Sequence, residues 1–141
     1  MIGACAGKNV TTGGYNIFFG DRAGCTVTTG SKNVLIGKSA GQNMCGSSYE
    51  NVFIGHQAAV SAQASNRNVA IGVNIMTQGG LVGNYNVLFG RDLVNANVCR
   101  TTGFTENIIG GSYAAYNATS SGCNLILGNR AGYSITSGQS N

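Results

Sequence analysis

The chain has 141 residues, of which 23 are glycine, none is proline or tryptophan, and only 9% are charged. Its 43% of hydrophobic residues excludes a disordered tail, and glycines recur too densely for an amphipathic helix to persist. The net charge of +4 comes from single, scattered Lys and Arg, without the basic run of a nucleic-acid groove. The longest apolar runs are also far too short to span a membrane. We therefore expect neither a nucleic-acid partner nor membrane insertion.

A block of Asn, three apolar residues and Gly recurs along the whole chain. The blocks predict strands near residues 16–19, 33–36, 51–54, 68–71, 86–89, 107–109 and 124–127. After most blocks comes Ala-Gly or a near match, such as Ala23 and Gly24, and then an apolar residue such as Val27. Steps of 17, 18, 17, 18, 21 and 17 residues separate the asparagines. This period predicts an all-β fold, a β-solenoid of about eight coils of 17–18 residues. Residues 1–141 would be one solenoid segment, cut from a longer fibre.

The asparagine that opens each block is a candidate structural ladder. An Asn amide can stack on the Asn of the next coil and also adopt a turn conformation. The positions are Asn16, Asn33, Asn51, Asn68, Asn86, Asn107 and Asn124. The alternative is that each asparagine only forms a turn.

The three apolar residues of each block point alternately to opposite sides of the strand. We assign the outer two, such as Val34 and Ile36, to the interior of the coil, facing Val27 and Ile135. The middle residues would then form an interchain ladder, made of Phe18, Leu35, Phe53, Ala70, Leu88, Ile109 and Ile126. Such a stripe would be covered by parallel copies around a rotation axis. The alternative is a wider monomeric solenoid that buries both faces.

No combination of side chains points to catalysis or to a metal. The four acids fall in different coils, and these are Asp21, Glu50, Asp92 and Glu106. The single histidine, His56, follows a strand at a corner. General acid–base catalysis needs converging titratable groups, so we expect no enzyme and no cofactor.

The five cysteines fall at different phases of the repeat. They are Cys5, Cys25, Cys45, Cys99 and Cys123. An odd number without a CxxC pair supports neither a disulfide framework nor a zinc site. We expect free thiols that fill small gaps, with interchain disulfides as the alternative.

The fifth coil is three to four residues longer than the others. Insertions in solenoids form surface loops, which often carry contacts. Candidate ligand contacts are Asn95, Asn97, Arg100, Tyr113 and Tyr116. The tyrosines are suited to stacking on a sugar. The alternative is that the whole segment serves only as a shaft.

Residues 33–41 (NVLIGKSAG) and 68–72 (NVAIG) resemble two kinds of repeat. They are similar to the head repeats of trimeric autotransporter adhesins, and more so to the Gly- and Asn-rich repeats of bacteriophage tail fibres and related viral fibres. The resemblance implies a homotrimeric, left-handed β-roll or β-prism rod that serves as a fibre shaft or adhesive head. It places the chain in a virion or on a cell surface. Its partners would be its own copies, further rods stacked end to end, and a host receptor or glycan.

Two other functions remain open at this point. The same rods could build a cellular adhesin or an extracellular filament. An ice-binding solenoid is the third possibility, because Thr26-Val27-Thr28 supplies one Thr-x-Thr pattern.

Overall fold

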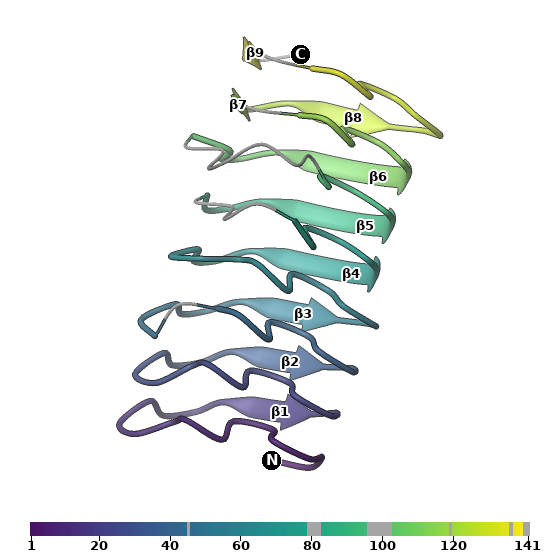
Figure 1. Ribbon diagram of the computed structural model, residues 1–141. Helices are drawn as coiled ribbons and strands as arrows, with labels where there is room; N and C mark the ends of the chain where they lie inside the picture. The colour runs from purple at the N-terminus through teal and green to yellow at the C-terminus, as the bar shows by residue number, and fades with distance from the viewer. Residues whose placement is uncertain (45, 79–82, 96–102, 119, 136, 140–141) are drawn as a thin grey trace.

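The computed structural model describes residues 1–44, 46–78, 83–95, 103–118, 120–135 and 137–139. The chain winds into coils that stack one above another, with the N-terminus at one end of the stack and the C-terminus at the other (Figure 1). This arrangement confirms the all-β solenoid.

Seven parallel strands form the main sheet in the order β1-β2-β3-β4-β5-β6-β8. They are β1 (Ile17–Phe19), β2 (Val34–Ile36), β3 (Val52–Ile54), β4 (Val69–Val73), β5 (Val87–Arg91), β6 (Ile108–Ser112) and β8 (Leu125–Leu127). Two further strands, β7 (Ser120–Gly122) and β9 (Ser137–Gln139), pair in a small parallel sheet of their own. The coil count is slightly below the eight expected, because Ile2 adds only an isolated bridge to Phe19.

The sequence blocks locate the main-sheet strands well but miss two features. Strands β4, β5 and β6 continue two residues further than expected, through the glycine to Val73, Arg91 and Ser112. The small sheet of β7 and β9 was not predicted, because its segments, Ser-Ser-Gly and Ser-Gly-Gln, lack the apolar alternation that indicates a strand.

The block asparagines form a continuous amide ladder inside the rod. The Oδ1 atom of Asn33 accepts hydrogen bonds from the backbone N–H and the Nδ2 of Asn51, at 3.1 and 3.0 Å. The same pair of bonds links each neighbouring couple in turn, namely Asn16–Asn33, Asn51–Asn68, Asn68–Asn86, Asn86–Asn107 and Asn107–Asn124. All but Asn16 are buried. Each coil therefore positions the backbone of the next one.

The expected assignment of the two strand faces is reversed. The middle residues of the blocks are buried in the interior of a single chain, and these are Phe18, Leu35, Phe53, Ala70, Leu88, Ile109 and Ile126. They form the chain's own core and are not an interchain ladder. The reason is parity: the buried Asn51 and Phe53 are two residues apart in an extended strand, so both side chains point inward. Val52 and Ile54 consequently point outward.

The rest of the core comes from the second half of each coil. Ala23 and Val27 are fully buried, and Ile135 packs partly buried against the same cluster. In the coil of β4, Ile75 takes the place of this small alanine, while the strand contributes only Ala70. This exchange of a large and a small residue keeps the volume of the interior nearly constant along the rod.

A column of glycines makes the corner after each strand possible. Gly55 has φ +129, a conformation that L side chains rarely adopt. A Cβ built on Gly55 would lie 1.8 Å from the carbonyl oxygen of Gly72 in the next coil. Stacking at the strand spacing of about 4.8 Å therefore requires glycine at this corner.

Candidate functional site

The outward-pointing strand residues form two parallel apolar columns along the rod. The first column is Ile17, Val34, Val52, Val69, Val87, Ile108 and Leu125, in register from strand to strand. The second column is Phe19, Ile36, Ile54, Ile71, Phe89, Gly110 and Leu127. We call these two columns the outer apolar face. It carries no charged side chain.

Much of the outer apolar face is accessible to solvent in the single chain. Leu125 is 59% exposed, Phe19 50% and Ile71 45%, whereas the residues of β2 and β3 are half-buried. An apolar surface that follows a whole sheet is larger than soluble monomers usually leave uncovered. The face is therefore the strongest candidate for an interaction surface.

Gly110 occupies the one position of the outer apolar face that has no side chain. A Cβ on Gly110 would lie 2.3 Å from ring atoms of Phe89, the residue paired with it on β5. The Phe89 ring therefore takes up the space that a side chain at position 110 would need. The column loses one side chain there but is not left hollow.

The structure separates the expected ligand contacts. Asn97 and Arg100 lie outside the described residues. Asn95 is buried, and its Oδ1 accepts hydrogen bonds from the backbone N–H of Thr77, at 3.0 Å, and from the Thr77 hydroxyl. The Asn95 side chain therefore holds the preceding coil in place and is not a surface contact.

Tyr113 and Tyr116 do lie together and belong to a larger aromatic stack. Their ring centroids are 5.6 Å apart, and Tyr116 also stacks on Tyr133 of the next coil at 5.3 Å. The guanidinium of Arg91 lies 5.7 Å from the centroid of Tyr113. These contacts engage the rings with one another, and Tyr133 was not among the candidates although the repeat places it 17 residues after Tyr116.

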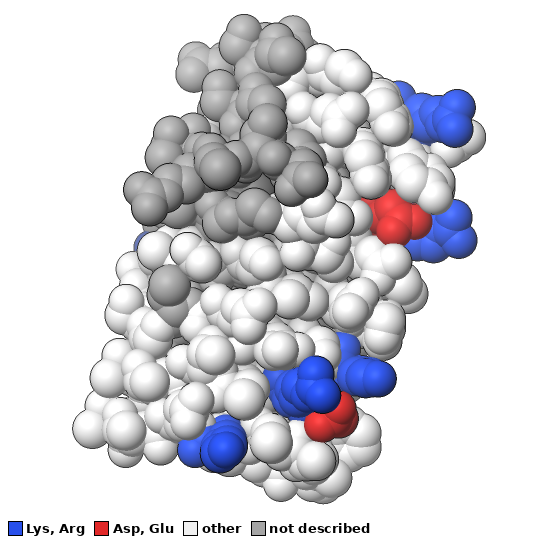
Figure 2. Space-filling view, viewed as in Figure 1, with Lys and Arg blue, Asp and Glu red and all other residues white. Residues whose placement is uncertain are grey.

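The acidic residues serve ion pairs at the surface. Asp92 pairs with Arg91 at 3.1 Å, and its Oδ1 accepts a hydrogen bond from Asn74 of the preceding coil. Asp21 lies 3.9 Å from Arg22. Among the described residues, no three His, Cys, Asp or Glu side chains gather as a metal site would require. Few charged groups interrupt the surface in view in Figure 2.

A more concentrated polar cluster joins three successive coils just before β2, β3 and β4. Glu50 accepts bonds from Lys32 at 3.3 Å and from Arg67 at 2.8 Å. The Arg67 guanidinium lies 5.4 Å from the ring centroids of both Tyr49 and Tyr85. Hydrogen bonds from Arg67, and then from Lys32, hold the pKa of the Glu50 carboxyl below its ordinary value. The sequence treats these residues as isolated, but each lies one repeat from the next.

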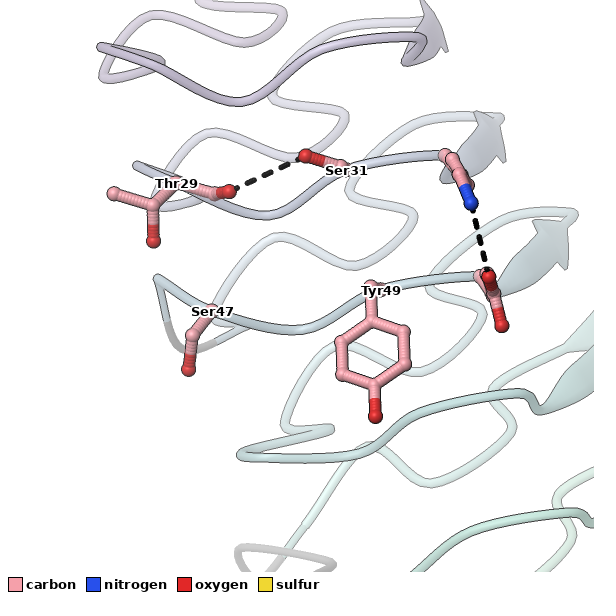
Figure 3. A pocket seen from close by; sticks show the side chains of 6 residues that line it. Thr29, Ser31, Ser47 and Tyr49 are labelled. Carbon is pink, nitrogen blue, oxygen red and sulfur yellow. Dashed lines mark hydrogen bonds and ion pairs between the residues drawn. The ribbon is translucent and has the colours of Figure 1, made fainter.

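A small pocket of 270 Å³ opens beside this cluster, between the second and third coils (Figure 3). Its walls are formed by Thr29, Ser31, Lys32, Ser47, Tyr49 and Glu50. It combines hydroxyl groups, one aromatic ring and an ion pair. Sequence reasoning missed the pocket because its two halves come from segments 18 residues apart.

The threonines of the Thr-x-Thr pattern bond to neighbouring coils. Thr26 Oγ1 lies within hydrogen-bonding distance of the carbonyl oxygens of Gln42 and Met44, at 2.8 and 2.7 Å. The carbonyl of Thr28 accepts a bond from Thr11 Oγ1 at 3.1 Å. The pattern therefore takes part in the stacking of coils.

Among the described cysteines, Cys5, Cys25 and Cys123 are free thiols, whereas Cys45 and Cys99 lie outside the described residues. The Cys123 thiol donates a hydrogen bond to Glu106 at 3.2 Å, and this carboxylate raises the pKa of the thiol. The thiols therefore do not share one environment.

No helix among the described residues is long and apolar enough to cross a membrane. In comparisons with known proteins, no family model, no curated protein and no solved structure matches this chain.

Proposed function

We propose that this chain is a structural fibre protein whose rods associate through the outer apolar face as a parallel homotrimer. The observation that carries the proposal is the pair of apolar columns along the main sheet. Leu125 and Leu127 at one end and Ile17 and Phe19 at the other are all at least half exposed. Burying these columns would supply hydrophobic stabilisation of about 25 cal/mol per Å².

A second copy of the chain is the occupant that best fits this face. The side chains recur once per coil, at the strand spacing of about 4.8 Å. A partner that contacts every coil equally needs the same period along the same direction, and another copy of the rod has it. Because the face carries no charge, identical copies bring no like charges together on it.

Three copies rather than two are favoured by the resemblance of residues 33–41 and 68–72 to trimeric fibre repeats. Closed rotational symmetry is also the usual arrangement of soluble oligomers. In a parallel trimer each coil meets the same coil of its neighbours. End-to-end stacking of such rods would then lengthen the fibre.

The resemblance also supports a phage or viral tail fibre that takes part in attachment to a host cell. The low charge and the polar, Asn-rich corners suit a shaft exposed outside a cell. A cellular adhesin or surface filament would use the same rod, and the proteins found with the chain in a purified virion would distinguish the two.

The molar mass in solution tests the trimer. Light scattering of the purified chain should give three times its mass of 14.4 kDa. The change Ile71→Lys places a charge in the middle of the outer apolar face and should reduce this mass to that of one chain. The far-ultraviolet circular dichroism should keep its β signal.

The matched control is Gln63→Lys, which adds the same charge at an exposed position outside the face. This variant should remain trimeric. A monomeric wild-type chain would overturn the self-association. A stable dimer would overturn the trimer and leave only the role of the face.

A further inference from the structure

The pocket between the second and third coils has a wall that is fixed before any ligand arrives. The Tyr49 ring lines the pocket and is also stacked by the Arg67 guanidinium at 5.4 Å. Arg67 is held in turn by Glu50, at 2.8 Å, and by Tyr85. A ring that is already held in place loses little conformational freedom on binding.

Several polar groups of this pocket retain bonding capacity. The Lys32 ammonium has three donors, and its only bond among the described residues goes to Glu50. The hydroxyl of Ser31 accepts from the backbone N–H of Gly14 and lies at the long distance of 3.5 Å from the carbonyl of Thr29. Figure 3 shows the Ser31, Ser47 and Tyr49 side chains on the two coils that bound the pocket.

The charge balance of the site favours an anion. Lys32 and Arg67 supply two positive charges, and Glu50 supplies one negative charge between them. The Arg67 bond to Glu50 is the shorter of the two, so Lys32 is the cation more available to a ligand. A ligand with a carboxylate would reach Lys32 through a charge-assisted hydrogen bond.

We propose that this pocket binds a single sugar residue that carries a carboxylate, as in an acidic glycan. Sugar hydroxyls would pair with Ser31 and Ser47, a sugar face would lie on Tyr49, and the carboxylate would meet Lys32. A volume of 270 Å³ lies just below the range of pockets for larger small-molecule ligands. It therefore suits one sugar unit better than an extended chain.

The combination occurs once among the described coils. The residue two before the block asparagine is Ser31 in the second coil, Tyr49 in the third and Asn66 in the fourth. Only the third coil therefore pairs an aromatic ring with a lysine of the coil before it. A trimer would carry three copies of this pocket, and multivalent attachment strengthens weak binding. The inference names a ligand class for the attachment part of the proposed function, and it rests on that function only for its biological role.

Binding can be tested on the intact chain by saturation-transfer difference nuclear magnetic resonance and by titration. The probes are glucuronate, glucose and inorganic phosphate. We expect glucuronate to bind about tenfold more tightly than glucose, since it adds one hydrogen bond to a charged group. Phosphate should bind more weakly than glucuronate.

Two substitutions with matched controls locate the site. Tyr49→Ala should abolish detectable binding of glucuronate, whereas Tyr85→Ala, which removes the other tyrosine stacked on Arg67, should retain it. Lys32→Met should remove the preference for glucuronate over glucose. Lys38→Met removes a lysine outside the pocket and should leave that preference intact.

Equal affinity for glucuronate and glucose, or undiminished binding by Tyr49→Ala, would overturn the proposal. Tighter binding of phosphate than of glucuronate would reduce the site to a simple anion site and overturn the sugar. The molar mass of the same sample separates this result from the trimer: a trimer that binds no glucuronate refutes the pocket alone. A monomer that binds it refutes the trimer alone.

Discussion

The Nδ2 of Asn51 donates to Oδ1 of Asn33 over 3.0 Å, and both side chains are fully buried. The same Nδ2 also donates to the carbonyl of Ser65, and Oδ1 of Asn51 accepts from the backbone N–H of Asn68. One buried amide thus connects three coils. An internal ladder of this kind can be tested by removing a single member.

We expect Asn51→Ala to destabilise the chain by about 2–5 kcal/mol, because it leaves several buried polar groups without partners. Urea unfolding followed by circular dichroism measures this loss. Asn129→Ala removes an exposed asparagine and should change the free energy of unfolding by less than about 0.5 kcal/mol. Similar stabilities for the two variants would contradict a structural role of the ladder.

The glycine corner gives a second prediction. Gly55→Ala should cost about 3 kcal/mol or more, since the new Cβ would collide with the carbonyl of Gly72 in the next coil. The soluble yield and the β signal in circular dichroism should both fall. Gly14→Ala is the control, because a Cβ on Gly14 meets nothing within 4 Å. A fully stable Gly55→Ala variant would show that the coils can separate at this corner.

The Glu50 cluster predicts a dependence on acid. Arg67 and Lys32 lower the pKa of Glu50 in the folded chain, below its ordinary value of 4.5. The resulting stabilisation is therefore fully present above pH 4.5 and is lost as the pH falls through the lower pKa of the folded state. Because the group is exposed, we expect a small effect.

Urea unfolding of the wild type and of Glu50→Gln at several pH values measures this contribution. The wild type should be the more stable of the two at neutral pH, and the difference should vanish in strong acid. A difference that stays constant across this range would refute the electrostatic origin.

Thiol reactivity provides a fourth prediction. The Glu106 carboxylate raises the pKa of the Cys123 thiol, so less of it is present as the reactive thiolate. Glu106→Gln should therefore speed the alkylation of Cys123 by iodoacetamide at a fixed, slightly alkaline pH. Peptide mass spectrometry follows the reaction, and the exposed Cys5 in the same molecules serves as the internal control. Equal acceleration at both cysteines would point to general loosening of the fold.

The repeat made the solenoid predictable because one short block sets strand, corner and period together. The error concerned the two strand faces. The outer apolar residues, such as Val52 and Ile54, were assigned to the interior, whereas the structure buries Asn51 and Phe53. The parity of positions 51 and 53 contained this information. The asparagine was read as a turn residue, so its inward direction was not applied to the strand.

The polar cluster could not be predicted from local preferences. Lys32, Glu50 and Arg67 adopt a positive φ of 57–59°, which residues other than glycine rarely do. Contacts with other coils hold them there, such as the bond from the Lys32 N–H to the carbonyl of Gly14, at 2.9 Å. Propensity scales describe neighbours in sequence and carry no information about such contacts. The column becomes visible only when residues 17 or 18 apart are aligned.

The direction of the bonds between coils has a mechanical consequence. The bond from the Val34 N–H to the carbonyl of Asn51, at 2.8 Å, links two coils along the rod, as do its counterparts in other coils. A pull along the rod therefore loads the bonds of the end coil first, and the coils would come away one at a time. Each coil of about 17 residues adds about 4.8 Å to the rod but about 58 Å to a straightened chain. A single chain under tension would lengthen roughly twelvefold before its backbone was taut, which would let it absorb a sudden load gradually.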